Sequence, residues 1–194
     1  MENQYIEIER KHEKLINIAI EKMKLSQDPK HNLVHVLDVV EYSKEILETE
    51  HEANKEVCMI AAYWHDIGRI QQNKGHELIS ANELKIEMEK QNYDEDFIEA
   101  CYKAIYKHSW KEGPETIEGI VVRDADKIDF VGINRWKECI KNDCRFEKIL
   151  ELLPTLRKDI LKLEVSKEIF DREIGKLVAF LHNQTFNNKN KHIN

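Results

Sequence analysis

Apolar residues recur every three to four positions along most of the chain, and strand-like alternation of apolar and polar residues is nearly absent. This spacing indicates helices with one buried face. The pattern predicts helices over residues 4–24, 30–50, 53–66, 76–91, 95–109 and 115–129, with two or three more over 131–186. Because the chain has only six glycines and three prolines, few positions interrupt these helices. We therefore expect an all-α fold.

Turn-forming residues predict where the helices begin and end. Asp28 is expected to cap the second helix, with Pro29 at its first helical position. Gly68 is expected to end the third helix in a left-handed conformation. Farther along, Gly132 predicts a break between helices, and Pro154 predicts a kink or a helix start.

The third predicted helix is apolar on nearly every side from Val57 to Trp64, which indicates a central, buried helix. It ends in the dipeptide His65-Asp66. Both side chains are costly to bury unless they are paired, hydrogen-bonded or bound to a metal. Imidazole nitrogens and carboxylate oxygens are common ligands of first-row metals. Although such a dipeptide also occurs by chance, its place at the end of a buried helix favours a divalent-metal site.

Further histidines could complete such a site. His31 and His35 are four residues apart, so they share a face of the second predicted helix. His76 follows Gly75 at a predicted helix start, and His108 lies near a predicted helix end. Each also has a structural interpretation: His31 as a residue at the helix start, His35 as a hydrogen-bonded core residue, and His108 as a cation that the helix dipole favours.

An acidic pair, Asp124 and Asp126, lies in the apolar sixth helix. Burial of an unpaired carboxylate costs several kcal/mol, so ligation of a metal would explain such a pair. The alternative is a solvated helix face on which Arg123 and Lys127 are the partners of these carboxylates.

The length of 194 residues predicts one domain over residues 1–186, followed by a polar tail over 187–194. A domain of this size buries roughly 70% of its unfolded surface and needs no metal for stability. A metal site here is therefore expected to be functional.

Charge and cysteine content narrow the function classes. With 30 basic and 37 acidic residues, the net charge of −7 argues against extended nucleic-acid binding. A small anionic substrate remains compatible, because a metal and local cations outweigh distant charges. No Cys-x-x-Cys pair occurs, and Cys58 and Cys101 fit helical core patterns, which favours a reducing compartment. No apolar run approaches the roughly 18 residues of a membrane span, so we expect a cytoplasmic protein.

Four segments carry a resemblance to a known family: His31-Asn32-Leu33-Val34-His35, Trp64-His65-Asp66-Ile67-Gly68-Arg69, Gly75-His76-Glu77 and Asp124-Ala125-Asp126-Lys127-Ile128-Asp129. Over about residues 28–130 the chain resembles the HD-domain superfamily of metal-dependent phosphohydrolases. The resemblance implies an all-helical bundle with a metal at its centre, held by His35, His65, Asp66 and Asp126.

Family members with two metals add histidines at positions that resemble His76 and His108, and Asp66 would then bridge the ions. The resemblance therefore implies one or two divalent ions, which could be Mn, Fe, Co, Mg or Zn. The chain departs from its relatives at Asp38, where small members often carry arginine. It also lacks the Gly-Tyr-Pro signature of cyclic-di-GMP phosphodiesterases and the Glu-Asp pair of (p)ppGpp hydrolases.

The resemblance predicts hydrolysis of a phosphomonoester or phosphoanhydride in a nucleotide-like metabolite by metal-activated water. Asp66 and Arg69 are the expected catalytic residues, and Arg69, His31 and Lys127 are the expected contacts to a phosphate. For Arg69 the alternative is a helix-capping cation, and for Lys127 it is a surface pair with Asp124.

Two other functions are compatible with the same residues. Some relatives with this fold use a di-iron pair and dioxygen, and others are non-catalytic regulatory modules. The region from Arg145 to Phe186 carries no motif. Its apolar residues, among them Leu150, Leu156 and Val178, are expected either to close the bundle or to form a homodimer contact.

Overall fold

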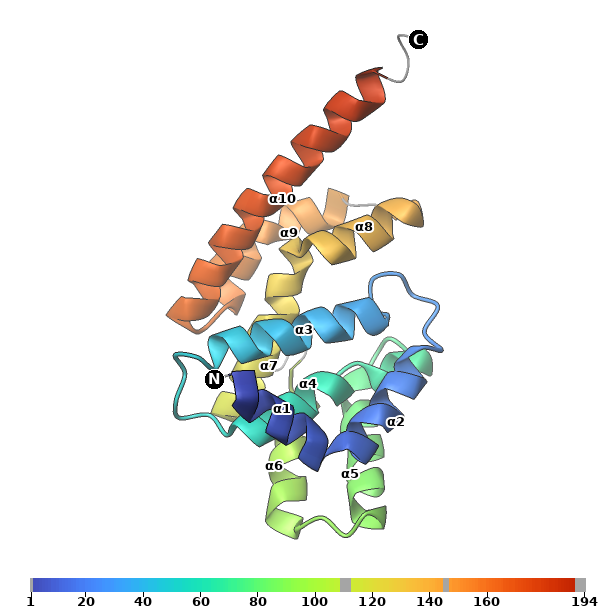
Figure 1. Ribbon diagram of the computed structural model, residues 1–194, viewed down its shortest axis with the longest axis vertical. Helices are drawn as coiled ribbons and strands as arrows, with labels where there is room; N and C mark the ends of the chain where they lie inside the picture. Colours follow the sequence, from blue (N-terminus) through green and yellow to red (C-terminus); the bar gives the residue numbers. More distant parts are fainter. Residues whose placement is uncertain (1, 109–112, 145–146, 191–194) are drawn as a thin grey trace.

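The computed structural model describes residues 2–108, 113–144 and 147–190, and within these ranges the regular secondary structure is entirely helical. The all-α prediction is confirmed. The α-helices are α1 (Glu2–Lys11), α2 (Glu13–Met23), α3 (Leu33–Ile46), α4 (Lys55–Trp64), α5 (His76–Lys90), α6 (Glu95–Tyr106), α7 (Ile117–Ile128), α8 (Ile133–Lys141), α9 (Glu147–Thr155) and α10 (Glu164–Asn190) (Figure 1). Short turns η1 (Ile67–Ile70) and η2 (Asp129–Val131) are 3₁₀, and η3 (Leu156–Ile160) is a π turn.

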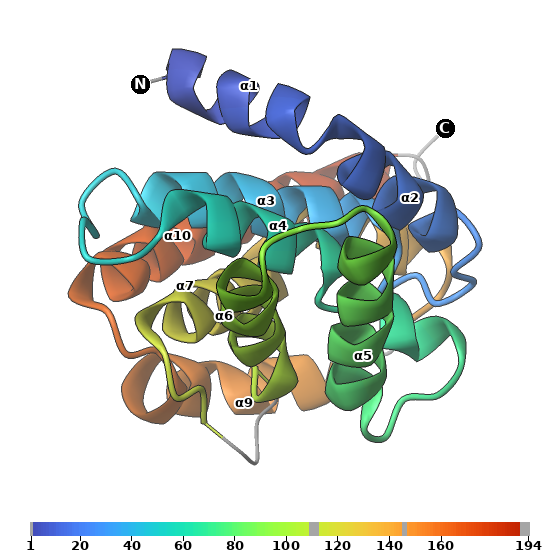
Figure 2. The same cartoon turned by 90° about the horizontal axis from the view of Figure 1, so that it is seen from below.

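Helix α4 is the centre of the bundle, as its apolar sequence predicts. Every residue from Val57 to Trp64 is buried. The helix packs against α2, α3, α6 and α7, which surround it (Figure 2). Because α4 is enclosed on all sides, the residues that follow it, His65 and Asp66, also lie in the protein interior.

The prediction of a single N-terminal helix over residues 4–24 is wrong. The chain forms two helices there, α1 and α2, with a break at His12. The ring of His12 is buried and stacks on Tyr93 and Phe97. Its Nδ1 lies 2.9 Å from the hydroxyl oxygen of Tyr93. The break therefore coincides with a polar ring that is anchored to the α5–α6 connection, which the apolar pattern of α1 and α2 does not reveal.

Helix α3 begins later than expected, and Asp28 does not cap it. The cap is Asn32, whose side-chain oxygen accepts a hydrogen bond from the backbone N–H of His35 at 3.2 Å. Asp28 instead accepts from the backbone N–H of Lys30 within the preceding turn. His31 consequently lies in the turn before α3, so the expectation that it lies on the helix with His35 is also wrong.

Gly68 does not adopt the left-handed conformation expected of it. It lies inside the turn η1, and the glycine with positive φ is Gly75, at +75°, directly before α5. Gly68 is instead a point of close approach. A Cβ atom there would overlap the carbonyl oxygen of His76 and lie 2.9 Å from Cβ of Ile79.

Helix α10 packs on α7 and α8 at one side of the bundle and extends beyond it (Figure 1). Gly132 separates η2 from α8, as predicted, and Pro154 lies in the last turn of α9, before the π turn. Leu156 is buried, but Leu150 and Val178 are 50% and 61% exposed, so these two do not belong to the core. Among the helices that the structure describes, we find none with the length and apolar character needed to cross a membrane.

Asp124 joins the C-terminal region to the core. Its side chain is fully buried, and its oxygens accept hydrogen bonds from the backbone N–H groups of Lys162 and Leu163, at 2.9–3.2 Å, just before α10 begins. The alternative of a solvated helix face is wrong for this residue. Its oxygens are the acceptors for these two backbone N–H groups, which precede the first turn of α10.

We expect Asp124→Ala to lower the free energy of unfolding by about 3 kcal/mol, because hydrogen bonds to a charged acceptor contribute roughly 1.5–3 kcal/mol each and the backbone N–H groups of Lys162 and Leu163 lose their acceptor. Urea denaturation measures this loss. Asp124→Asn keeps an acceptor oxygen and should lose less. Equal stabilities of Asp124→Ala and the parent protein would contradict the tethering role.

Candidate metal centre

Six side chains from five helices or their ends meet in the interior of the bundle. All six are at most 4% exposed. They are His35 of α3, His65 and Asp66 after α4, His76 at the start of α5, His108 after α6 and Asp126 of α7. The structure therefore brings together the complete set of ligands that the sequence predicts.

One half of the cluster is formed around His35. Its Nε2 lies 3.2 Å from Nε2 of His65, 3.4 Å from Oδ2 of Asp66 and 3.5 Å from Oδ1 of Asp126. The ligand atoms of His35, His65 and Asp126 lie within 4.8 Å of one another, so this group could hold a metal ion.

The other half is formed around His76 and His108, whose Nε2 atoms are 3.3 Å apart. Oδ1 of Asp66 lies 3.2 Å from Nε2 of His76 and 3.9 Å from Nε2 of His108. This group could hold a second ion. Asp66 thus presents one carboxylate oxygen to each half of the cluster.

The orientation of the histidine rings is fixed by their other nitrogens. Nδ1 lies within hydrogen-bond distance of an acceptor in each of the four: the carboxylate of Asp129 for His35 at 2.6 Å, and the backbone carbonyl three residues earlier for His65, His76 and His108 at 2.7–2.9 Å. A carbonyl accepts only from a protonated Nδ1, so the Nε2 of a neutral ring carries its lone pair toward the centre. In the pair of His76 and His108, the lone pairs face each other at 3.3 Å and fit a cation between them.

Electrostatic effects within the centre are strong. Burial lowers the pKa of His65 to about 3. Burial also opposes charge on His35, but hydrogen bonds to Asp129 and Asp66 outweigh it and raise the pKa of His35 to about 9. Burial would raise the pKa of Asp66, yet the nearby cationic and imidazole groups hold it well below its usual range. Asp66 is therefore ionised and suited to bind a cation.

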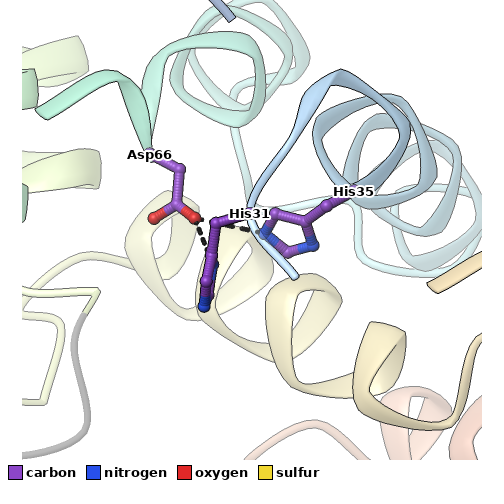
Figure 3. Close-up of side chains that lie close together, drawn as sticks. All are labelled: His31, His35 and Asp66. Atoms are coloured by element: carbon purple, nitrogen blue, oxygen red, sulfur yellow. Dashed lines mark hydrogen bonds and ion pairs between the residues drawn. The ribbon is translucent and has the colours of Figure 1, made fainter. Parts of the chain in front are cut away.

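The three predicted phosphate contacts lie at the edge of the cluster. Nδ1 of His31 is 2.7 Å from Oδ2 of Asp66 (Figure 3), and Nε of Arg69 donates to Oδ1 of Asp66 at 2.7 Å. Lys127 pairs with Asp126 at 2.5 Å rather than with Asp124. His31 and Arg69 are partly exposed, at 14% and 18% of their side chains, so they face the solvent side of the centre. His31 also shares a potential metal-binding group with His35 and Asp66.

Two residues outside the predicted site, Asp129 and Arg135, support His35. Asp129 is fully buried, and it accepts a hydrogen bond from Nη1 of Arg135 at 3.1 Å in addition to its contact with His35. Asp129 was visible as the last residue of the Asp-Ala-Asp-Lys-Ile-Asp segment. Arg135 follows on α8 and carries no sequence signal of its own.

The chelator-treated protein is expected to lose stability as the pH falls from about 7 to about 5. Burial lowers the pKa of His31 to about 4 and that of His65 to about 3. Between pH 6.5 and 5, these histidines are therefore protonated in the unfolded chain and neutral in the folded chain. Each histidine then costs about 1.4 kcal/mol per pH unit below 6.5. His35 does not offset this loss, because its pKa is raised and its contribution is already complete below 6.5.

Urea denaturation at the two pH values measures this difference. His65→Asn should reduce the slope, because the substituted residue does not titrate. If the chelated parent protein were equally stable at both pH values, the burial of neutral histidines in the apoprotein would be contradicted.

Comparisons with known proteins agree with this geometry. The model of the HD domain matches residues 32–130. A predicted HD superfamily hydrolase from an uncultured Thermotogales bacterium is 22% identical and has a TM-score of 0.67, with 91% of this chain and 92% of that chain covered. Bacillus subtilis YpgQ, in complex with ADP, is 17% identical with a TM-score of 0.68, covering 93% and 96%. The Lin1889 protein of Listeria innocua is 21% identical with a TM-score of 0.60, covering 88% and 93%. No curated protein matches the chain. At these identities the solved structures establish the fold.

Proposed function

The chain belongs to the HD-domain family, and we propose that it is a metal-dependent phosphohydrolase acting on a phosphomonoester or phosphoanhydride of a nucleotide-like metabolite. One observation carries the proposal. Four histidines are held through Nδ1 while their Nε2 atoms face two ionised carboxylates in a buried cluster. Such an arrangement has high electrostatic cost without a cation and is favourable with one.

We assign one ion to His35, His65, Asp66 and Asp126, and a second to Asp66, His76 and His108. Nitrogen and oxygen ligands suit Mn, Fe, Co, Mg or Zn. When bound, divalent ions would acidify a water molecule and polarise a phosphoryl oxygen. Asp66 would contact both ions, because one of its oxygens faces His35 and the other faces His76.

The residues at the edge of the cluster would bind the substrate. Arg69 uses Nε to hold Asp66, and the remaining N–H groups of its guanidinium are suited to two oxygens of one phosphate. His31 and Lys127 contact Asp66 and Asp126, so each would place a donor next to a phosphate at the centre. The preference for a nucleotide-like substrate is supported by the ADP in the complex of Bacillus subtilis YpgQ, which has the same fold.

The proposal is tested by measuring phosphate release from a panel of nucleotides and sugar phosphates with added Mn²⁺. The parent protein is compared with His65→Ala, which removes a fully buried ligand. Release that disappears in the variant and with chelator supports hydrolysis. No release from any compound by folded, metal-loaded protein would reject it, and iron content with oxygen uptake would then test a di-iron oxygenase.

A further inference from the structure

Arg123 is a buried cation that the proposed reaction does not yet use. It lies on α7, one turn before Asp126, and is 5% exposed. Its Nε is enclosed and has no hydrogen-bond partner, and among the residues that the structure describes no carboxylate forms an ion pair with it. A buried cationic N–H group without a partner is costly, which calls for an explanation in terms of an anion that binds the guanidinium.

The two other buried cations of the described chain are compensated. Lys127 pairs with Asp126, and Arg135 pairs with Asp129. The neighbour of Arg123 in the sequence, Asp124, is occupied by the backbone amides before α10. The carboxylates nearest to Arg123 in the sequence, Asp124 and Asp126, thus bind other groups, and Arg123 forms no ion pair with either. Burial lowers its pKa, and Asp124 and Asp126 oppose that shift only in part.

The position of Arg123 relates it to the metal centre. Residues three and four apart on a helix share a face, so Arg123 lies on the face of α7 that carries Asp126 and Lys127. The tip of the guanidinium is adjacent to Gly113, where a Cβ atom would lie 3.2 Å from Nη1. Gly113 belongs to the connection from His108 to α7. Arg123 thus precedes one proposed ligand, Asp126, by one turn of α7, and its tip lies beside the connection that follows another, His108.

We propose that Arg123 binds a second phosphate group of the substrate, beyond the phosphate held at the metal centre. This inference rests on the proposed function for the reaction, and it narrows the substrate class to phosphoanhydrides. A guanidinium presents paired N–H donors that match two phosphate oxygens. A monoester with one phosphate at the metals would leave Arg123 uncompensated.

Binding of small anions tests this assignment without catalysis. Isothermal titration calorimetry compares orthophosphate with imidodiphosphate, a P–N–P analogue of pyrophosphate that resists hydrolysis, with Mn²⁺ at the same excess in cell and syringe. We expect the parent protein to bind imidodiphosphate roughly 10- to 100-fold more tightly than orthophosphate, the range for a charged hydrogen-bonded contact. Arg123→Met should abolish this preference while leaving orthophosphate binding within about twofold.

The matched control is Lys14→Met, which removes one positive charge from an exposed position on α2 and should keep the preference. Arg123→Met should also raise the thermal midpoint in the absence of ligand, because it removes an uncompensated buried charge. If this variant fails to fold, Arg123→Lys provides the test, since an ammonium cannot bind two oxygens in a fork and should lose at least part of the preference.

The proposal is overturned if the parent protein does not prefer imidodiphosphate, or if the folded Arg123 variants bind it as tightly as the parent. These results are distinct from a failure of the proposed function. Absence of phosphate release with the preference intact would reject hydrolysis and retain the anion site. Phosphate release without the preference for imidodiphosphate would support hydrolysis and reject the anion site at Arg123.

Discussion

Replacing Asp66 with alanine is expected to lower kcat/KM for phosphate release by about 1000-fold, because metal ions contribute several kcal/mol to such reactions and each 1.36 kcal/mol is a factor of ten. Asp66 is the residue whose two oxygens face both halves of the centre, 3.4 Å from Nε2 of His35 and 3.2 Å from Nε2 of His76. It also holds His31 and Arg69. One substitution therefore removes the proposed bridge and the anchor of two substrate contacts.

Metal content measured by mass spectrometry separates the causes of this loss. We expect at most one ion per chain in Asp66→Ala and up to two in the parent. Asp124→Asn is the matched control, since it changes a buried carboxylate of the same region that lies outside the cluster. A variant at Asp66 with unchanged metal content and activity within about tenfold of the parent would refute the bridging assignment.

Gly68→Ala is expected to lower the free energy of unfolding by about 3 kcal/mol, the upper end for overpacking a close contact. The added Cβ would overlap the backbone carbonyl of His76, so η1 and the start of α5 must separate. For a chain of this size the midpoint of thermal unfolding should fall by about 6–12 °C. Because Asp66 precedes η1 and His76 begins α5, the second metal-binding group should be lost together with stability.

Thermal unfolding of the chelated and Mn²⁺-loaded protein measures both effects. The control is Gly175→Ala on α10, where a Cβ atom meets nothing within 4 Å. This change should raise stability by about 0.5–1 kcal/mol, because alanine favours a helix over glycine. Equal midpoints of thermal unfolding for Gly68→Ala and the parent would contradict the prediction, because they would show that η1 and α5 can move apart without loss of stability.

The sequence alone predicts the helical architecture and the identity of the six clustered side chains. The apolar sequence of α4 required a central position, and this placed His65 and Asp66 in the interior. Helix boundaries were less well predicted, because local signals compete. Asp28 and Asn32 are equally good cap residues by type, and the structure shows that Asn32 makes the hydrogen bond to the backbone N–H of His35.

Features that depend on contacts between distant segments could not be predicted. The break at His12 depends on rings more than 80 residues away, and the role of Gly68 depends on the carbonyl of His76. Asp124 was expected to be either a ligand of the cluster or an exposed residue, and it is instead a buried tether to the amides before α10. The lack of a partner for Arg123 is likewise visible only when its surroundings are known.

The supports of the four histidines differ in a way that bears on how such a centre evolves. His65, His76 and His108 are oriented by backbone carbonyls three residues earlier, which persist whatever side chain those positions carry. The Nδ1 of His35 instead faces a side chain, that of Asp129, and the Nδ1 of His76 has the carboxylate of Glu77 at 3.2 Å beside its backbone acceptor. Mutation of Asp129 can therefore change the basicity of His35, whereas the carbonyl acceptors of His65 and His108 persist when side chains change. Changes of metal preference among descendants of this protein should accordingly accumulate around Asp129 and Arg135.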